Sequence, residues 1–339
     1  MSALKILRAD GLMTVQDAGR AGHLAQGVSR GGAMDRRALV EAAALLGLRE
    51  LPAAIEMAGA GGSFSVTEPM RVALAGAPMA ATLDGAKLRW NCTHLVEPGQ
   101  TLRLGGMEAG LYGYLAPAGG IAAEPWMGSR AAHLAIGIGR LLESGDSLPC
   151  GADPDPGRPA RTLAPEQRFG GGRVRTVDGP QTGLFEPEVL EAFYATAFTR
   201  APRGNRQGVA LAAERHFTSE HAAGLASDVI QPGDLQMTGE GLPYVLMAEC
   251  QTMGGYPRIG TVIPADLPTV AQAVPGTALH FQRVSFAEAD RICRSEADQL
   301  REAAARCRNL VRDPADIADL LSYTLVSGVT AGDDLDRTD

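Results

Sequence analysis

The sequence has 339 residues, more than one small domain needs, and indicates two domains at roughly 150 residues each. Hydrophobic residues make up 45% and charged residues 21%, as in an ordinary globular protein, and the net charge of −8 without a basic cluster excludes a broad nucleic-acid interface. Glycine (42) and proline (21) are abundant without a short period, which favours many turns and therefore β structure.

The predicted strands are short and are separated by turn residues such as Asp84-Gly85 and Pro232-Gly233. In chain order they cover residues 3–7, 71–75, 94–96, 101–104, 112–116, 244–248 and 278–284.

Three helices are predicted. Asp35 caps the first, which runs through Leu46 and ends at Gly47. A second covers 187–198 and begins with a proline in its first turn. The third begins with a capping box at Ser285 and runs to Cys307 as an outer packing helix. Its apolar stripe is Ala289, Cys293, Leu300 and Ala304.

Residues 151–172 are rich in glycine and proline and are predicted to be a linker or long loop. The predicted domains are therefore 1–150 and 173–285, followed by a C-terminal helix and tail over 286–339. Residues 111–121 and 244–256 share a pattern of a strand followed by Gly-Gly. Two similar β-barrels made by duplication would explain this echo, and so would the ordinary sequence preferences of β-turns.

Several cofactor sites have no motif in this chain. A P-loop, a G-x-S-x-G elbow and a biotin-bearing Met-Lys-Met are all missing. The six histidines lack metal-ligand spacing, and the five cysteines are odd in number and widely spaced. We therefore expect no bound metal and no disulfide framework. Without a signal peptide or a run of ~18 apolar residues, we expect a cytoplasmic protein.

Four stretches are candidate sites. In the first, Gln16, Asp17 and Arg20 are crowded between glycines after a strand, and Arg20 is suited to binding a carboxylate. A local Asp17–Arg20 ion pair that holds a turn is the alternative. In residues 31–35, capping by Asp35 explains the pattern better than ligand binding. The turn at 128–130 either anchors a loop or binds a ligand.

The fourth stretch, 249–262, has polar residues at the end of an apolar strand. Gly254 and Gly255 are predicted to expose backbone N–H groups, Gln251 and Thr252 to supply neutral hydrogen bonds, and Tyr256 to stack on or donate to a small planar ligand. A bare turn is the alternative. None of the four stretches supplies a nucleophile with its base, which is typical of one part of a multi-component enzyme.

Several motifs together resemble one family, the allophanate hydrolase subunit 2-like or biotin-dependent carboxyltransferase family, which includes component C of 5-oxoprolinase. The resemblance covers residues ~5 to ~290, and Leu320–Val329 is also similar to the tail of some members. The motifs are VQDAGR at 15–20, GAMD at 32–35, AGGI at 118–121, GSR at 128–130 and QTMGGYPRI at 251–259.

The resemblance implies a mainly β fold with two cyclophilin-like β-barrel domains and a few peripheral helices. It also implies two partners, an allophanate hydrolase subunit 1-like protein (component B of 5-oxoprolinase) and a LamB/YcsF-type protein (component A). Together these proteins open 5-oxoproline to glutamate with ATP. In urea carboxylase, the equivalent domain moves a carboxyl group from carboxybiotin to urea. Both reactions need charge to be stabilised on an amide or carboxyl oxygen.

The sequence departs from the family pattern at several points. Ala210 stands where a second arginine is usual, and Ala131 replaces a threonine. Ser29-Arg30-Gly31 replaces Pro-x-Ser, and 42–46 lacks the usual asparagines. If the missing arginine binds a substrate carboxylate, another small amide or acid replaces 5-oxoproline.

The predicted function is a subunit of an ATP-dependent amidohydrolase complex of the 5-oxoprolinase type. A carboxyltransferase component that serves a separate biotinylated protein is the first alternative, and a regulatory protein that binds a kinase-inhibitor-like partner is the second. The catalytic residues expected are Gln251, Thr252 and Tyr256. The substrate-binding residues expected are Gln16, Asp17, Arg20, Arg206, Gly254 and Gly255.

Overall fold

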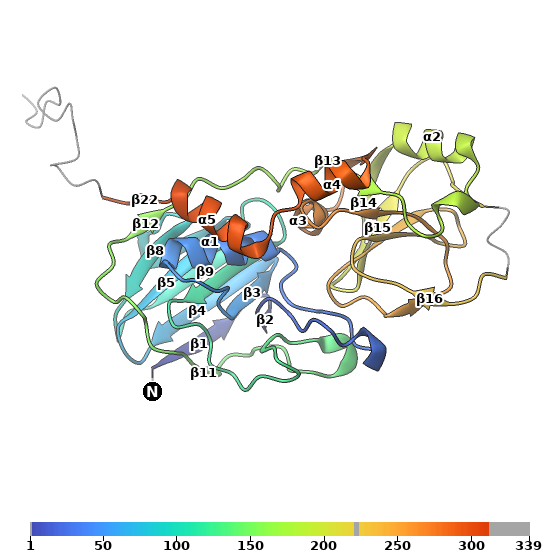
Figure 1. The fold of residues 1–339 in the computed structure, drawn as a ribbon. Helices are drawn as coiled ribbons and strands as arrows, with labels where there is room; N and C mark the ends of the chain where they lie inside the picture. Colours follow the sequence, from blue (N-terminus) through green and yellow to red (C-terminus); the bar gives the residue numbers. More distant parts are fainter. Residues whose placement is uncertain (1, 220–223, 312–339) are drawn as a thin grey trace, which may run out of the picture.

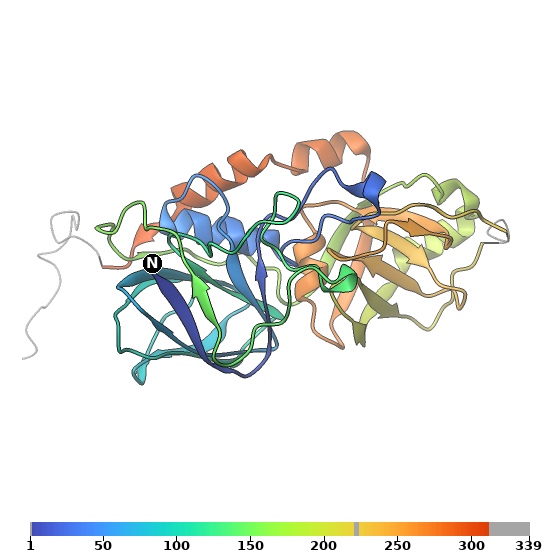
Figure 2. The same ribbon diagram turned by 90° about the horizontal axis from the view of Figure 1, so that it is seen from below.

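The computed structural model describes residues 2–219 and 224–311, which form an N-terminal β unit and a C-terminal β-barrel side by side (Figure 1). Two helices near the C-terminus run across both units (Figure 2). The prediction of a mainly β fold with few helices is confirmed.

The N-terminal unit contains two sheets with antiparallel pairing. The first has the order β11-β1-β4-β9-β6-β7, and the second β2-β3-β10-β5-β8-β12-β22. The first comprises β1 (Ala3–Ala9), β4 (Ala60–Val66), β6 (Met79–Leu83), β7 (Ala86–Lys87), β9 (Leu102–Met107) and β11 (Ser147–Pro149). The second comprises β2 (Leu12–Gln16), β3 (Ala54–Ala58), β5 (Met70–Gly76), β8 (Cys92–Val96), β10 (Tyr112–Pro117), β12 (Arg161–Thr162) and β22 (Arg308–Asn309).

A buried apolar cluster fills the space between these sheets. Side chains on β1 and β4 alternate in exposure, and Ile6 and Phe64 point inward with Leu104. Ile55, Leu74 and Leu115 belong to the same cluster from the second sheet. The pattern is that of a sandwich whose sheets each turn one face to a shared core.

Helix α1 (Arg36–Leu46) covers the other face of the second sheet. As predicted, it begins after Asp35, whose carboxylate accepts a hydrogen bond from Ala38 N at 3.1 Å, and it ends at Gly47 with φ of +77°. Its alanine-rich sequence lets it lie close to β5 and β10, so nine of its eleven residues are buried.

The C-terminal unit is a closed barrel with the order β13-β20-β17-β18-β15-β14-β21. Four phenylalanines from α2, two strands and a loop pack together inside it, with ring centroids 4.9–5.6 Å apart. They are Phe193, Phe198, Phe217 and Phe281.

The strands of the barrel are β13 (Gly172–Val177), β14 (Ala197–Gly204), β15 (Gly208–Ala212), β17 (Asp234–Met237), β18 (Pro243–Leu246), β20 (Arg258–Val262) and β21 (Ala278–Arg283). The unit also contains α2 (Pro187–Ala195), α3 (Leu267–Gln272) and the separate pair β16 (Asp228–Val229) with β19 (Met253–Gly254). Short 3-10 helices are η1 (Leu24–Gln26), η2 (Leu134–Ile136) and η3 (Thr182–Leu184).

The two units close around their cores differently. Of the sheets formed by the described residues, only the C-terminal one is a closed barrel. The first unit ends in short edge strands such as β7 and β22 and is completed by packing between faces. An echo of strand and Gly-Gly in sequence therefore accompanies two different sheet arrangements.

The helix predicted over 285–307 is two helices, α4 (Phe286–Ile292) and α5 (Glu296–Arg306), and the single-helix prediction is wrong. Ser295 begins a second helix by accepting a hydrogen bond from Asp298 N at 3.1 Å. Cys293 already has an extended backbone, so the predicted apolar stripe spans two elements. The predicted tail motif over 320–329 lies outside the described residues.

The segment after residue 285 returns to the N-terminal unit. Helix α5 packs on α1, and β22 pairs with β12 at the edge of the second sheet (Figure 1). The predicted linker 151–172 is largely extended, but it carries β12 and buries Leu163 and Arg168. Among the described residues, no helix combines the length and apolar character needed to cross a membrane.

Candidate functional site

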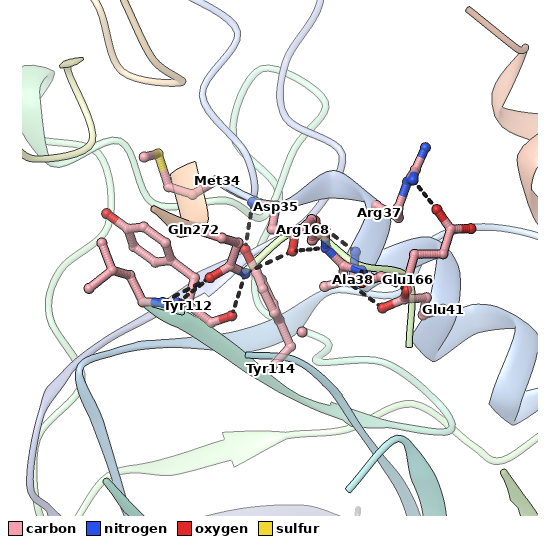
Figure 3. Close-up of polar contacts among 12 residues, drawn as sticks. Met34, Asp35, Arg37, Ala38, Glu41, Tyr112, Tyr114, Glu166, Arg168 and Gln272 are labelled. Atoms are coloured by element: carbon pink, nitrogen blue, oxygen red, sulfur yellow. Dashed lines mark hydrogen bonds and ion pairs between the residues drawn. The ribbon is translucent and has the colours of Figure 1, made fainter. Parts of the chain in front are cut away.

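The two units are joined by a buried polar network around Gln272, at the end of α3 (Figure 3). Its amide nitrogen donates to Asp35 Oδ2 at 2.8 Å and to Tyr112 O at 2.9 Å. Its amide oxygen accepts from the backbone N–H groups of Leu111 and Tyr112 at 2.9 and 3.0 Å. One barrel side chain therefore binds both the helix α1 cap and strand β10.

Arg168, from the predicted linker, neutralises two buried carboxylates in the same network (Figure 3). Its guanidinium donates to Asp35 at 2.7 Å and to both oxygens of Glu41 at 2.9 and 2.7 Å. Burial raises the pKa of Glu41, while Arg168 opposes that rise. The capping interpretation of Asp35 is thus correct, and this carboxylate has no free side for a ligand.

A second buried cluster joins the units through Arg206, which lies between β14 and β15. It donates to Glu249 Oε1 at 2.5 Å, to Gly32 O at 2.7 Å and to Glu56 Oε1. Glu56 also accepts from Tyr114 Oη at 2.6 Å and from Met34 N at 2.8 Å. Arg206, predicted to bind substrate, is therefore held by two carboxylates of the protein itself.

Ser29, His133 and Glu249 lie in a row beside this cluster. Ser29 Oγ is 2.8 Å from His133 Nε2, and His133 Nδ1 is 3.8 Å from Glu249 Oε2. The order of groups is that of a catalytic triad, but Ser29 is 2% exposed and the second distance is too long for a hydrogen bond. The row is closed to substrate and links the two units.

The predicted residues of the first stretch all hold one loop. Gln16 Nε2 donates to Ala132 O at 3.2 Å, and Arg20 Nη2 donates to Ala131 O. Asp17 accepts from Ser129 Oγ and Arg130 N, both at 2.6 Å. The stretches 11–23 and 128–130 thus meet, and the loop-anchoring interpretation of 128–130 describes this contact.

The alternative of an Asp17–Arg20 ion pair is not observed, because Asp17 bonds to the loop and to Gly19 N at 2.8 Å. Arg20 is only 2% exposed, and its Nε and Nη1 have no hydrogen-bond partner among the described residues. Burial lowers the pKa of Arg20. A buried guanidinium with unused donors is uncommon enough to require an explanation.

Four of the predicted site residues line one pocket on the barrel, of about 600 Å³, here called the barrel pocket. They are Gln251, Gly254, Gly255 and Tyr256. Gln236 lies beneath Gly254; it is 7% exposed, and its Nε2 has no partner among the described residues. The other lining residues are Arg203, Gln207, Thr238, Gly239, Glu240, Tyr244 and Leu246.

The second Gly-Gly pair is not the predicted turn. Gly254 belongs to strand β19, and neither Gly254 nor Gly255 has a positive φ. A Cβ added at Gly254 would lie 2.6 Å from Gln236 Nε2, so this glycine is needed for a close approach. Gly119 serves another contact, against the backbone of Gly151, and the two pairs are not equivalent.

Thr252 is not among the lining residues of the barrel pocket. Its carbonyl accepts a hydrogen bond from Ile230 N at 3.0 Å, and its side chain faces the loop that carries Gly27, where an added Cβ would lie 4.0 Å from Thr252 Oγ1. The predicted set therefore divides among the barrel pocket, the interface cluster and the loop 129–132.

A second cavity, of about 640 Å³, lies where the two units and the C-terminal helices meet, and is called the interunit pocket here. Its walls come from residues 20–37, from barrel residues near 247 and 264–268, and from 292–302. Sequence reasoning missed this pocket, since these segments are far apart in the chain and the arginines among them form no motif. Gln236 and Tyr244 of the barrel pocket were missed for the same reason.

The sequence matches the family model described as carboxyltransferase domain, subdomain A and B, over residues 26–283. It is 34% identical to a protein of Escherichia coli (strain K12) named as component C of 5-oxoprolinase, over 90% of this chain and 99% of that protein. It is 27% identical to urea amidolyase of Lachancea kluyveri, over 84% of this chain and 17% of that protein.

The solved structure of TTHA0988 has a TM-score of 0.75 and 31% identity to this chain, covering 83% of this chain and 56% of that one. The barrel, the two-sheet unit and the matched segment together define a carboxyltransferase-type fold. The chain belongs to the carboxyltransferase domain family, subdomains A and B. The family resemblance found in the sequence is thereby confirmed.

Proposed function

We propose that this chain is one component of an ATP-dependent enzyme of the 5-oxoprolinase type, and that its barrel pocket receives a small amide. The observation that carries this proposal is the 34% identity over 99% of a protein named as a component of 5-oxoprolinase. The match to urea amidolyase covers only 17% of that longer protein, at lower identity.

The chemistry of the barrel pocket suits an amide that acquires negative charge on its oxygen. Gln236 Nε2 is a buried donor without a partner among the described residues, and Gln251 offers a second neutral amide at the rim. Neutral donors fixed by the fold stabilise a developing oxyanion without reorganising. Tyr256, which is 52% exposed, is placed to cover a small planar ligand.

The barrel pocket needs help from another chain to complete a reaction. Among its described lining residues there is no serine, cysteine, histidine or lysine to act as nucleophile with its base. We propose that an allophanate hydrolase subunit 1-like protein and a LamB/YcsF-type protein supply the ATP chemistry. These partners also account for the lack of a nucleotide motif in this sequence.

The departure at Ala210 bears on the substrate. Ala210 lies on β15 directly opposite Tyr244, a lining residue of the barrel pocket. An arginine at this position would stand next to the pocket wall, so its loss changes the charge available to a substrate. The assay therefore includes several small amides besides 5-oxoproline.

The test is co-purification with the two partner proteins, followed by ATP hydrolysis and product formation with L-5-oxoproline, urea and related amides. We expect Gln251→Ala and Tyr256→Ala to lower amide turnover at least tenfold. Gln282→Ala and Phe286→Ala are matched controls, because both residues are exposed and lie outside the barrel pocket. A stable complete complex that turns over no amide would refute the proposed activity.

A further inference from the structure

The interunit pocket is large enough for a small organic molecule and is built on three separate parts of the fold. Binding cavities for such molecules typically measure ~300–1,000 Å³ and are found between domains. This one measures about 640 Å³ and includes the N-terminal end of α1 and the link between α4 and α5. Its ligand would therefore touch both units.

Two arginines of this pocket converge on one carbonyl group. Arg30 Nε donates to Ala18 O at 3.0 Å, and Arg36 Nη1 donates to the same oxygen. Arg36 also pairs with Glu296 at 2.7 Å, whereas Arg30 has no ion pair among the described residues. A single carbonyl oxygen cannot neutralise two positive charges, so the pair leaves an excess of positive charge at the pocket wall.

The repulsion between these groups is reflected in Arg36. Burial lowers its pKa first, and the neighbouring Arg30 lowers it further. Two like charges held side by side are costly unless an anion binds between them. This arrangement is what a bound carboxylate or phosphate group would stabilise.

Arg20 adds an independent observation at the same pocket. It is a lining residue, it is 2% exposed, and two of its donor nitrogens lack partners among the described residues. Arg20 also has no carboxylate in salt-bridge contact in this part of the structure. Its charge therefore adds to the excess from Arg30 and Arg36.

The acidic lining residues do not cancel this excess, because other arginines occupy them. Glu166 pairs with Arg37 and, at 2.6 Å, with Arg306. Glu302 lies 3.8 Å from Arg294. Within the described part of the pocket, both lining carboxylates are thus already paired.

The remaining wall is largely apolar and includes Val28, Met34, Leu267, Pro268 and Ile292. We propose that the interunit pocket binds a small organic molecule through an oxyanion, a carboxylate or phosphate group, held by Arg30 and Arg36. The apolar body of the ligand packs against Met34 and Leu267. This site is distinct from the barrel pocket, and its binding does not depend on the proposed reaction.

Isothermal titration calorimetry on the isolated chain tests this site with three probes: L-5-oxoproline, L-glutamate and inorganic phosphate. We expect saturable binding of at least one probe, weakened at least tenfold in Arg30→Ala and in Arg36→Ala. The first two probes report a carboxylate source, and the third a phosphate source. Arg103→Ala, an exposed arginine on β9, is the matched control and is expected to bind as the unmodified protein does.

Arg30 is exposed, so its replacement leaves the fold intact, and equal melting temperatures confirm this for each variant. Saturable binding that is lost in Arg30→Ala and Arg36→Ala but kept in Arg103→Ala establishes the site. Absence of binding for all three probes overturns the proposal. So does equal affinity in Arg30→Ala, Arg36→Ala and Arg103→Ala.

Discussion

Arg206 of the barrel and Glu56 of the N-terminal unit form an ion pair across the junction of the two units, and Glu249 binds the same guanidinium from the other side at 2.5 Å. The side chains of both carboxylates are only 3% exposed. The positive charge of Arg206 is therefore what makes two buried negative charges tolerable at this junction.

Replacing Arg206 should destabilise the protein strongly. Arg206→Ala leaves two buried carboxylates without their cation, and breaking a buried pair in this way costs about 3–5 kcal/mol. Urea-induced unfolding followed by fluorescence measures the change. Arg283→Ala is the control, since its partner Asp178 and Arg283 itself are 39% and 49% exposed and such pairs contribute at most about 1 kcal/mol. Equal losses in the two variants would contradict the role given to Arg206.

The sequence predicted the elements well where the signal is local. Asp35 as a helix cap and Gly47 as a helix end are both confirmed, because capping depends on neighbours within one turn. The predicted strands were likewise found within a few residues. The helix over 285–307 was misjudged, since the second capping serine at Ser295 was read as part of one continuous stripe.

The site was predicted only in part. Glycines and polar residues within one stretch identified Gln251, Gly254 and Tyr256, which the structure gathers in the barrel pocket. Arg206 was predicted as a ligand for substrate, but its partners Glu56 and Glu249 are 150 and 43 residues away. No single-sequence pattern reports such distant pairing, so the interface clusters and the interunit pocket needed coordinates.

Two neighbouring glycines should differ sharply in their tolerance of a methyl group. In Gly254→Ala the new Cβ would lie 2.6 Å from Gln236 Nε2, closer than real contacts allow, so Gln236 must move out of the barrel pocket. In Gly255→Ala the nearest contact, with Ser227 Oγ, is at an ordinary 3.6 Å. We expect amide turnover by the assembled enzyme to fall at least tenfold in Gly254→Ala only.

Because neither glycine has a positive φ, backbone strain does not confuse this comparison. Thermal melting of both variants shows whether each folds. Unchanged turnover in Gly254→Ala with a normal melting temperature would contradict the placement of the amide beside Gln236.

His133 should make the interface sensitive to acid. Burial lowers its pKa, Arg20 and Arg206 lower it further, and Glu249 opposes them. The unfolded chain therefore binds a proton at about pH 6.5, whereas the folded protein binds it only at lower pH. The stabilisation is complete above pH 6.5 and is lost as the pH falls through the folded-state pKa.

Urea unfolding at several pH values from 7.5 to 5 measures this effect. We expect the stability of His133→Gln to fall less over this range than that of the unmodified protein. His94, whose pKa burial also lowers, is present in both proteins and cancels in the difference. Parallel pH profiles for the two proteins would show that His133 does not contribute.

Gln272→Glu should turn the junction between the units into a pH-dependent one of opposite sign. The new carboxylate would stand at the 2.8 Å contact that Gln272 Nε2 now makes with Asp35 Oδ2, in a fully buried place. Burial and the like charge both raise the pKa of the introduced acid. Its raised folded-state pKa means that the protonated form fits best, so the variant loses stability as the pH rises from the unfolded value of about 4.3 through the folded one.

Unfolding curves at pH 5 and pH 8 should show that Gln272→Glu has a stability deficit, relative to the unmodified protein, that is larger at pH 8. Gln282→Glu, at an exposed position on β21, supplies the control, with a deficit that does not change with pH. A deficit in Gln272→Glu that is equal at both pH values would mean that the carboxylate escapes to solvent. The contact between Gln272 and Asp35 would then not fix the two units together.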